Sequence, residues 1–207
     1  MTLKKITDEE LIQADGLAIE RYNKKAPDKF KLHPELGSSP FEGDIETAGV
    51  ILLLANPGFD DQSTLHDHSF KPDGWPLAGL HHEAPSGLSS WWPQRLKELT
   101  KKFGAQHVSK HVAALQLTPW ASNKFDASLR LPSRERLLGL AEQAAQRGAV
   151  LLVMRASRLW DENPVVRQSP NRYRTNSWRC SYVTQGNLPA DAWQKVNAVL
   201  EQPRSDC

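Results

Sequence analysis

Short runs of apolar residues without strict polar alternation occur at three places in the chain. They are Val50 to Leu54, Val112 to Leu117 and Val150 to Met154. Strands that are covered on both faces in a parallel sheet have this pattern, because neither face of the strand meets water. The pattern therefore predicts three buried, neighbouring strands.

Helical patterns flank and separate these runs. We expect helices up to about Tyr22, over about 91–103, over about 134–147 and over about 189–201. Thr7 and Glu10 form a capping box that marks the start of the first helix. The alternation of strand and helix predicts an α/β domain, a three-layer α/β/α sandwich with a short central, mostly parallel sheet and right-handed crossovers.

The chain is expected to form a single domain, because 207 residues are enough for one core and few for two. With 39% hydrophobic and 24% charged residues it has the composition of a globular protein. We expect residues 1–47 to be a helix and a connecting loop that pack on the core, residues 48–201 to be the core, and residues 202–207 to be a mobile tail.

Several classes of protein are excluded by what the sequence lacks. No apolar run reaches the roughly 18 residues that span a bilayer, and the charged N-terminal segment is unlike a signal peptide. Cys180 and Cys207 are the only cysteines, too few for a disulfide framework, a four-cysteine zinc site or an iron–sulfur cluster. We therefore expect a cytoplasmic protein that does not bind membranes, and we also expect a monomer without a cofactor.

Candidate ligand-binding residues follow the predicted strands, because open α/β sheets bind ligands beyond the carboxyl ends of their strands. After the first strand, Pro57 fixes φ and Gly58 permits a positive φ, so that the chain turns sharply and holds Asn56 at the strand end. A plain strand-to-loop turn is the alternative. After the second strand come Thr118, Trp120 and Asn123, where Trp120 either contacts a planar ligand or closes the end of the core.

The long segment from Gln62 to Ser90 is expected to lack regular structure, and it carries most of the histidines. His66, His68, His81 and His82 suggest a metal site, and with it a metal-dependent small-molecule hydrolase. The segment has no H-E-x-x-H helix, however, and the chain has no G-x-S-x-G elbow and no glycine-rich phosphate loop after the first strand. We therefore predict no metal site, and the hydrolase remains an alternative.

A block of basic residues follows the third strand. Its members are Arg155, Arg158, Arg167, Arg172, Arg174 and Arg179. Only Asp161 and Glu162 oppose them, and the aromatic residues Trp160, Tyr173 and Trp178 lie between them. Although the net charge of the chain is only +2, such a block neutralises phosphates and predicts a nucleic-acid partner. A solvated loop decorated with arginines is the alternative.

The order of these segments resembles the uracil-DNA glycosylase superfamily. Leu54-Ala55-Asn56-Pro57-Gly58 is similar to the motif that ends the first core strand in its mismatch-specific and single-strand-selective branches. Further similar segments are "PSGLSSWWPQRLKEL" (85–99), "LQLTPWASN" (115–123), "MRASRLWDEN" (154–163) and "TNSWRCSYVTQGNL" (175–188). The resemblance extends in order over about residues 50–200.

The resemblance implies an α/β/α fold and a DNA-binding enzyme that hydrolyses the N-glycosidic bond of a flipped base, as in base-excision DNA repair. It implies that Asn56 holds the attacking water and that Thr118 is the nearest match to the residue that reads the base. Asn176 and Ser177 would contact a phosphate or the leaving base, and Asp60 or Asp61 would support positive charge on the sugar. The substrate-binding candidates are Ala55, Pro57, Gly58, Phe59, Trp75, Thr118, Trp120 and Asn123, of which Phe59 and Trp75, with Phe70, are the candidates for stacking on the base.

The chain departs from the family pattern at three places. Leu54 stands where the family has glycine, Thr118 is the nearest polar match where the family usually has a base-reading asparagine, and residues 175–188 contain no histidine. We therefore expect a damaged or modified base as substrate, rather than plain uracil. A noncatalytic nucleic-acid-binding relative of the same fold is the alternative, and the choice between single- and double-stranded DNA stays open.

Overall fold

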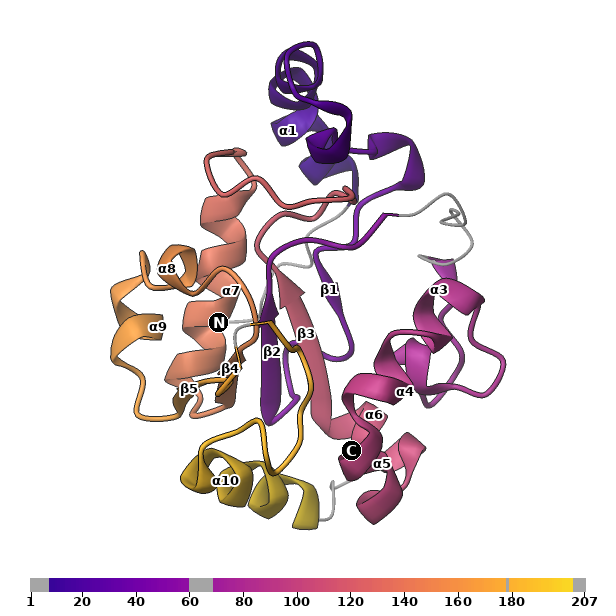
Figure 1. The fold of residues 1–207 in the computed structure, drawn as a ribbon, viewed down its shortest axis with the longest axis vertical. Coiled ribbons are helices and arrows are strands. Elements are labelled where there is room, and N and C mark those ends of the chain that lie inside the picture. Colours follow the sequence, from indigo (N-terminus) through magenta and orange to yellow (C-terminus); the bar gives the residue numbers. More distant parts are fainter. Residues whose placement is uncertain (1–7, 60–68, 178, 203–207) are drawn as a thin grey trace.

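The computed structural model describes residues 8–59, 69–177 and 179–202. Its centre is a five-stranded sheet in the order β1-β3-β2-β4-β5 (Figure 1). The strands are β1 (Phe41–Glu42), β2 (Val50–Leu54), β3 (Val112–Gln116), β4 (Val150–Val153) and β5 (Arg172–Arg174). β1 pairs with β3 in the antiparallel direction, and the other neighbours pair in parallel. The prediction of a mostly parallel sheet built on three buried strands is confirmed.

Helices connect the strands and cover both faces of the sheet. They are α1 (Asp8–Asn23), α3 (Ser86–Ser89), α4 (Trp92–Arg95), α5 (Lys97–Phe103), α6 (Ala105–His111), α7 (Arg134–Gln146), α8 (Ser157–Trp160), α9 (Pro164–Gln168) and α10 (Ala190–Glu201). The 3-10 helices are η1 (Asp28–Phe30), η2 (Pro34–Leu36) and η3 (Ala78–Leu80). The predicted first, 134–147 and 189–201 helices correspond to α1, α7 and α10.

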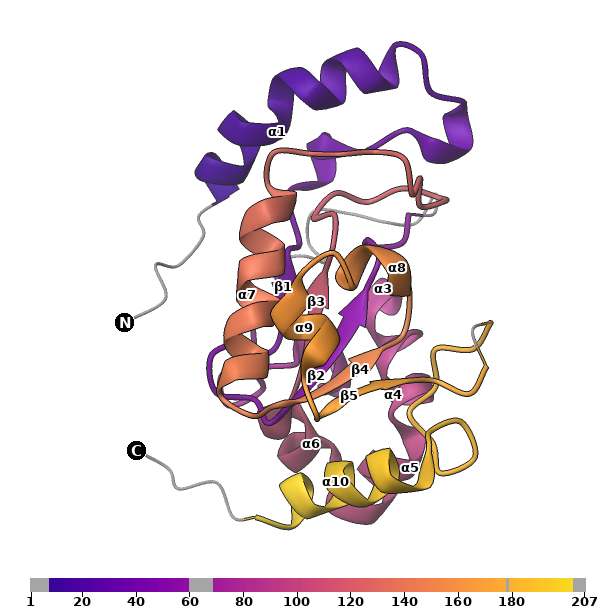
Figure 2. The same cartoon turned by 90° about the vertical axis from the view of Figure 1, so that its left-hand side faces the viewer.

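Alternate side chains of the buried strands enter two separate cores. Leu52 and Ala114 face one side, where α4, α5, α6 and α10 pack, and Ile51 and Leu115 face the other, where α7, α8 and α9 pack. The two views in Figures 1 and 2 show these layers on either side of the sheet. Every side chain of β2, β3 and β4 is buried, which explains the runs of apolar residues.

The connections that leave the central strands pass over different faces of the sheet. The connection that leaves β2 passes over the face covered by α4 to α6, whereas those that leave β3 and β4 pass over the face covered by α7 to α9. Connections that diverge in this way leave a crevice at the carboxyl ends of the strands. The segments that follow β2, β3 and β4 are therefore brought to one place.

The structure corrects three of the predicted elements. The helix expected over 91–103 is divided into α4 and α5, because Leu96 leaves helical geometry with φ −108° and ψ 14°. The loop expected over 24–47 contains η1, η2 and the strand β1, and part of the arginine block forms β5. Segment 62–90, expected to lack regular structure, contains η3 and α3 in its described part. Pairing with β3 and β4 creates the two additional short strands, β1 and β5.

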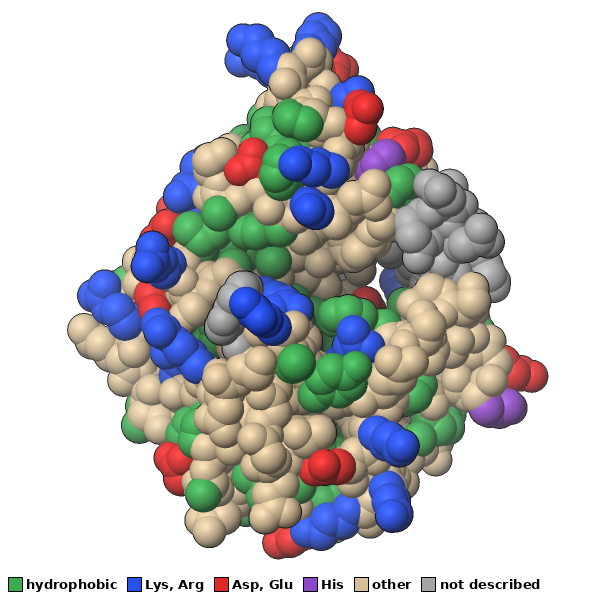
Figure 3. Space-filling view, viewed as in Figure 1, with side chains coloured by type: hydrophobic (Ala, Val, Ile, Leu, Met, Phe, Trp, Pro, Cys, Tyr) green, Lys and Arg blue, Asp and Glu red, His purple; other side chains and the backbone are tan. Residues whose placement is uncertain are grey.

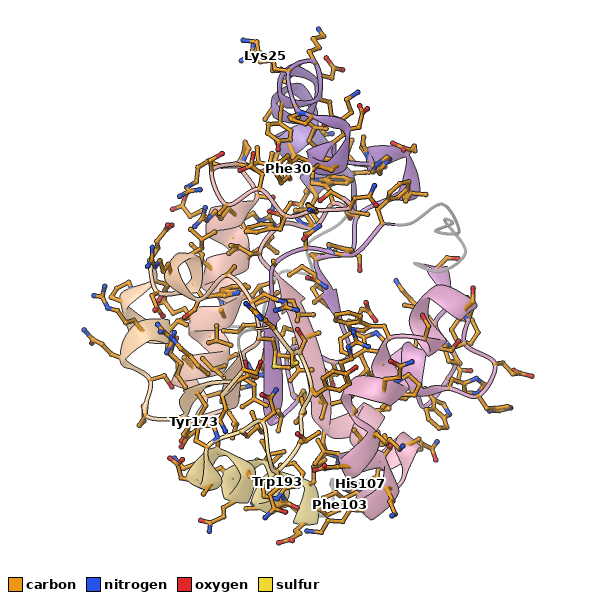
Figure 4. All side chains as sticks on the ribbon, viewed as in Figure 1. Lys25, Phe30, Phe103, His107, Tyr173 and Trp193 are labelled. Atoms are coloured by element: carbon orange, nitrogen blue, oxygen red, sulfur yellow. The ribbon has the colours of Figure 1, made fainter. Side chains whose placement is uncertain are left out.

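The N-terminal segment lies across the carboxyl end of the sheet, where a third apolar cluster joins it to the core. The cluster contains Leu11, Ile19, Leu32, Trp120 and Leu131. Figure 4 places Lys25 and Phe30 at this end, and Phe103 and His107 at the opposite end beside α10. There the His107 Nε2 lies 2.7 Å from the carbonyl oxygen of Leu200. Among the helices of the described segments, none has both the length and the apolar character that a membrane crossing needs.

Candidate functional site at the carboxyl end of the sheet

A cavity of about 560 Å³ lies at the crevice predicted by the topology. Its lining joins β1, the ends of β2 and β3, the turn after β2, the α3–α4 region and Arg155 after β4. Figure 3 shows a hollow to the right of the centre of this face, with Lys and Arg side chains on the surface to its left. The cavity thus gathers polar and aromatic groups from segments far apart in the sequence.

The turn after β2 forms one wall, and hydrogen bonds fix the orientation of Asn56 within it. Its Nδ2 donates to the carbonyl oxygen of Pro57 at 2.8 Å and to Ser122 Oγ at 2.9 Å. A carbonyl oxygen only accepts hydrogen bonds, so the end of the Asn56 amide that faces Pro57 must be the nitrogen. The other end is therefore the oxygen, Oδ1. Oδ1 accepts no hydrogen bond from the described part of the chain. Asn56 therefore presents an acceptor that a bound molecule or a water is able to use.

Gly58 has a different role from the one expected. The predicted positive φ is absent, and a Cβ added at Gly58 would meet no atom within 4 Å. Instead Gly58 forms an isolated parallel bridge with Ser122, which holds the turn beside the segment that follows β3. Pairing across the two segments, rather than glycine geometry, shapes this wall, and Ala55 and Pro57 lie buried within it.

Aromatic rings line the cavity beside this turn. Phe59 stacks on His33 with ring centroids 3.6 Å apart and an interplanar angle of 7°. Trp91 and Phe125 also line the cavity. Of the three candidates for stacking on a base, Phe59 is at the cavity, whereas Trp75 packs edge-on against His81 and Phe70 lies beside the same ring. Rings held in this way provide flat apolar walls for a planar ligand.

Gln116 and Glu42 form the polar floor of the cavity. Glu42 on β1 lies opposite Ala114 on β3, so Gln116, two residues further along β3, is its diagonal neighbour on the same face. Gln116 is 3% exposed, and its Oε1 has no hydrogen-bond partner within the described part of the chain. A buried amide oxygen without a partner is costly in a folded protein, so it marks a position where a ligand is able to bind.

Glu42 is a carboxyl group held in a largely apolar setting. Trp92 Nε1 donates to its Oε2 at 2.6 Å, and the indole ring itself is 2% exposed. Burial raises the pKa of Glu42 from 4.5 to about 7, although the hydrogen bond from Trp92 opposes this shift. A titratable group that changes charge near neutral pH inside a cavity is a candidate functional group.

Two arginines complete the lining. The Arg95 guanidinium carbon lies 3.8 Å from the centre of the Trp91 ring and 5.0 Å from that of Tyr182. Arg155 donates from an Nη to the carbonyl oxygen of Arg179 at 3.1 Å. The segment 175–188 therefore lies against the cavity through both arginines, and Val183 adds a backbone bond to the carbonyl oxygen of Arg95.

Asn187 organises segment 175–188 from within. Its Oδ1 accepts from the backbone N–H of Ser177 at 3.0 Å, and its Nδ2 donates to the carbonyl oxygens of Cys180 and Tyr182. Asn176 is exposed, and its Nδ2 donates to the carbonyl oxygen of Gly186 at 3.3 Å. Neither Asn176 nor Ser177 lines the cavity, and both belong to a hydrogen-bonded loop.

The residues predicted after β3 lie away from the cavity. Thr118 is buried, and its backbone N–H donates to the carbonyl oxygen of Ala55. Trp120 is fully buried and donates to Asp15 Oδ2 at 2.7 Å, so of its two predicted roles the structure shows closure of the core. Asn123 is exposed and is not part of the lining. Gln116, at the end of β3, takes the place in the cavity that Thr118 was expected to occupy.

The arginines of the basic block differ in how available they are to bind a phosphate. Arg172 donates to Asp161 and to Ser157 Oγ, and burial lowers its pKa. Arg174 is exposed but is also paired with Asp161, with 2.7 Å between Nη and Oδ2. Arg158 is exposed on α8. Asp161 therefore neutralises part of the block, and Arg172 serves the fold rather than the surface.

The histidine segment is only partly described. Within its described part, the possible ligand atoms of His81, His82 and Glu83 lie within 4.8 Å of one another. His81 Nδ1 is already bonded to the backbone N–H of Glu83 at 3.2 Å, and all three residues are consecutive on a surface turn. His66, His68 and the proposed Asp60 and Asp61 lie outside the described residues.

Sequence reasoning missed Glu42, Gln116 and Arg95 as site residues. Gln116 had a signal, because it is the polar residue that interrupts an apolar run at its carboxyl end. Glu42 had none, since its position depends on an antiparallel strand of two residues. No protein-family model, curated protein or solved structure matches this chain. The function must therefore be argued from the cavity.

Proposed function

We propose that the protein binds DNA and hydrolyses the N-glycosidic bond of a damaged or modified base that is flipped into the cavity. The observation that supports this best is the combination of groups in one space of about 560 Å³: flat aromatic walls, an amide and a carboxyl on the floor, and the Asn56 acceptor. A flipped base needs these groups, since it is held by stacking and read by hydrogen bonds to its edge.

The proposed reaction gives Asn56 a limited role. The bond between C1′ of the sugar and the base nitrogen breaks with its electron pair on the base, the water oxygen bonds to C1′, and the water proton goes to the leaving base. Asn56 Oδ1 holds the water by accepting one of its hydrogens. Because an amide is a poor general base, the rate depends on stabilising the leaving base, which Gln116 on the cavity floor is placed to do.

The surface beside the cavity suits a phosphate backbone. Arg158, Arg174 and Arg179 are exposed, and segment 175–188 lies against the cavity lining. Phosphate contacts fix the register of a protein on DNA and supply much of its affinity. The role proposed for Asp60 or Asp61, electrostatic support of a positively charged sugar, rests on their position directly after Phe59 in the chain.

Asn56→Ala is the first test. The metal-free protein is incubated with single- and double-stranded oligonucleotides that carry uracil, hypoxanthine, xanthine, 5-hydroxymethyluracil and 5-hydroxycytosine, and abasic sites are scored by alkaline cleavage. We expect the protein to cleave at one or more of these bases and Asn56→Ala to reduce turnover at least 100-fold while DNA affinity stays within about threefold.

Gln143→Ala is the matched control, because Gln143 is an exposed amide on α7, across the sheet from the cavity. It should cleave at the rate of the unchanged protein. Unchanged turnover in a folded Asn56→Ala variant would remove Asn56 from the mechanism. Salt-dependent DNA binding with no cleavage of any base would instead establish a noncatalytic nucleic-acid-binding protein.

A further inference from the structure

The floor of the cavity holds one polar group that adapts to its ligand. No group of the described segments bonds to Oε1 of the Gln116 carboxamide, so a hydrogen bond does not hold that oxygen in one position. An amide offers a donor at one end and an acceptor at the other. By turning over, Gln116 matches the edge of an amino-bearing base as well as that of an oxo-bearing base. It therefore does not choose between them.

Glu42 does not have this freedom. The bond from Trp92 Nε1 holds its Oε2, so the other carboxyl oxygen is the one offered to a ligand, and Glu42 lines the cavity at a position opposite Ala114 and diagonal to Gln116. An ionised carboxylate only accepts hydrogen bonds. It strengthens the binding of an amino group, to which it makes a charge-assisted bond, and it repels a carbonyl oxygen placed at the same point.

We infer that Glu42 is a specificity-determining residue, and that it selects a base with an exocyclic amino group over the corresponding oxo base. The inference rests on the proposed function, because it concerns the base held in the same cavity. Cytosine- and adenine-type lesions are amino bases in this sense, whereas uracil- and hypoxanthine-type lesions are oxo bases. The aromatic walls do not distinguish these two classes, because both present the same flat ring.

The selection should depend on pH, because only the ionised carboxyl excludes a carbonyl group. The pKa of Glu42, raised by burial to about 7, places this change near neutrality. The charged groups that share the cavity lining are Arg95, from α4, and Arg155, which follows β4.

The test compares Glu42→Gln with the unchanged protein on bases that differ only in an amino or an oxo group. The oligonucleotide pairs carry 5-hydroxycytosine against 5-hydroxyuracil and adenine against hypoxanthine, and kcat/KM is measured at pH 6 and pH 8.5. We expect the preference for the amino base to rise between pH 6 and pH 8.5. Glu42→Gln should lower it about tenfold or more at pH 8.5, because the substitution removes a charge-assisted hydrogen bond, and should abolish its pH dependence.

Glu46→Gln is the control, because Glu46 is an exposed carboxylate outside the cavity lining, and the preference should stay unchanged in it. Binding of free adenine and hypoxanthine to the protein, followed by calorimetry at pH 8.5, gives a readout that needs no turnover.

Cleavage with the same amino-to-oxo ratio in the unchanged protein and in Glu42→Gln would overturn the role of Glu42 but not the proposed glycosylase activity. Absence of cleavage, with adenine bound more tightly than hypoxanthine only when Glu42 is present, would overturn the glycosylase and keep the base site. Neither cleavage nor binding would overturn both.

Discussion

At the scale of single residues, the position of a polar side chain relative to the end of its strand decides whether it lines the cavity. Asn56 and Gln116 follow or end buried strands, and both line the cavity. Thr118, only two residues beyond Gln116, is buried outside it. β3 ends at Gln116, so alternation along the strand no longer positions Thr118, whose backbone N–H instead donates to the carbonyl oxygen of Ala55. Gln116 shares its face of the sheet with Glu42 and Ala114, and both polar groups line the cavity.

The raised pKa of Glu42 also leads to a prediction about stability, and the measurement that checks it needs no substrate. The pKa of its carboxyl is 4.5 ordinarily and about 7 in the folded protein, so the folded state holds a proton that the unfolded state has lost. The free energy of unfolding should therefore fall as pH rises from about 4.5 to about 7 and stay level above that range. In Glu42→Gln this contribution should be absent. Urea unfolding of both proteins between pH 4.5 and pH 8.5 measures the difference, and parallel curves would contradict the prediction.

At the scale of elements, short segments rather than long helices build the cavity. The connection from β2 to β3 is divided into η3, α3, α4, α5 and α6, which lets the chain follow the rim and place Trp91, Trp92 and Arg95 in or beside the cavity. The close approach of η3 to α4 depends on Gly79. A Cβ at that position would lie 2.1 Å from Trp92 Cδ1. The glycine therefore sets the position of the indole that holds Glu42.

Gly79→Ala should displace Trp92 and lower the free energy of unfolding by about 1–3 kcal/mol, as an overpacked core does. Gly139→Ala is the matched control, because Gly139 lies within α7 and a Cβ there meets nothing within 4 Å. That change should stabilise the protein by up to about 1 kcal/mol, since alanine favours the helix over glycine. Thermal and urea unfolding of the two variants measure the contrast. Equal effects of both substitutions would mean that the contact with Trp92 relaxes without cost.

At the scale of the whole molecule, the N-terminal segment is part of the architecture of the site. Asp15 on α1 is fully buried and accepts hydrogen bonds from Trp120 Nε1 and from the backbone N–H and Oγ of Ser133. These bonds connect α1 to the segment after β3 and to the start of α7. His33, which follows η1, supports the Phe59 wall by stacking. Loss of the connection at Asp15 should therefore loosen one side of the cavity.

Asp15→Ala should destabilise the protein by about 2 kcal/mol or more, because it leaves buried donors without acceptors. Residues 24–47 should also become more sensitive to proteolysis and faster in amide hydrogen exchange. Glu20→Ala on the same helix is the control, since that side chain is exposed, and it should change neither property. Unaltered exchange in Asp15→Ala would show that the apolar cluster alone holds the N-terminal segment in place.

The sequence alone determined the layers of this protein. Its three apolar runs are strands because apolar side chains on both faces require cover on both faces, and α1, α7 and α10 follow from helical spacing. It also pointed to the turn that bears Asn56, since ligands bind where parallel strands end.

Only the tertiary structure decided which groups share the cavity. Glu42 comes from a two-residue strand that exists only through its pairing with β3, and Arg95 reaches the cavity through a break in a helix. Trp120 donates to Asp15, 105 residues away in the chain, and Arg172 donates to Asp161, 11 residues away. Because of these bonds, neither Trp120 nor Arg172 lines the cavity. Such contacts depend on long-range packing, which periodicity and local motifs do not encode.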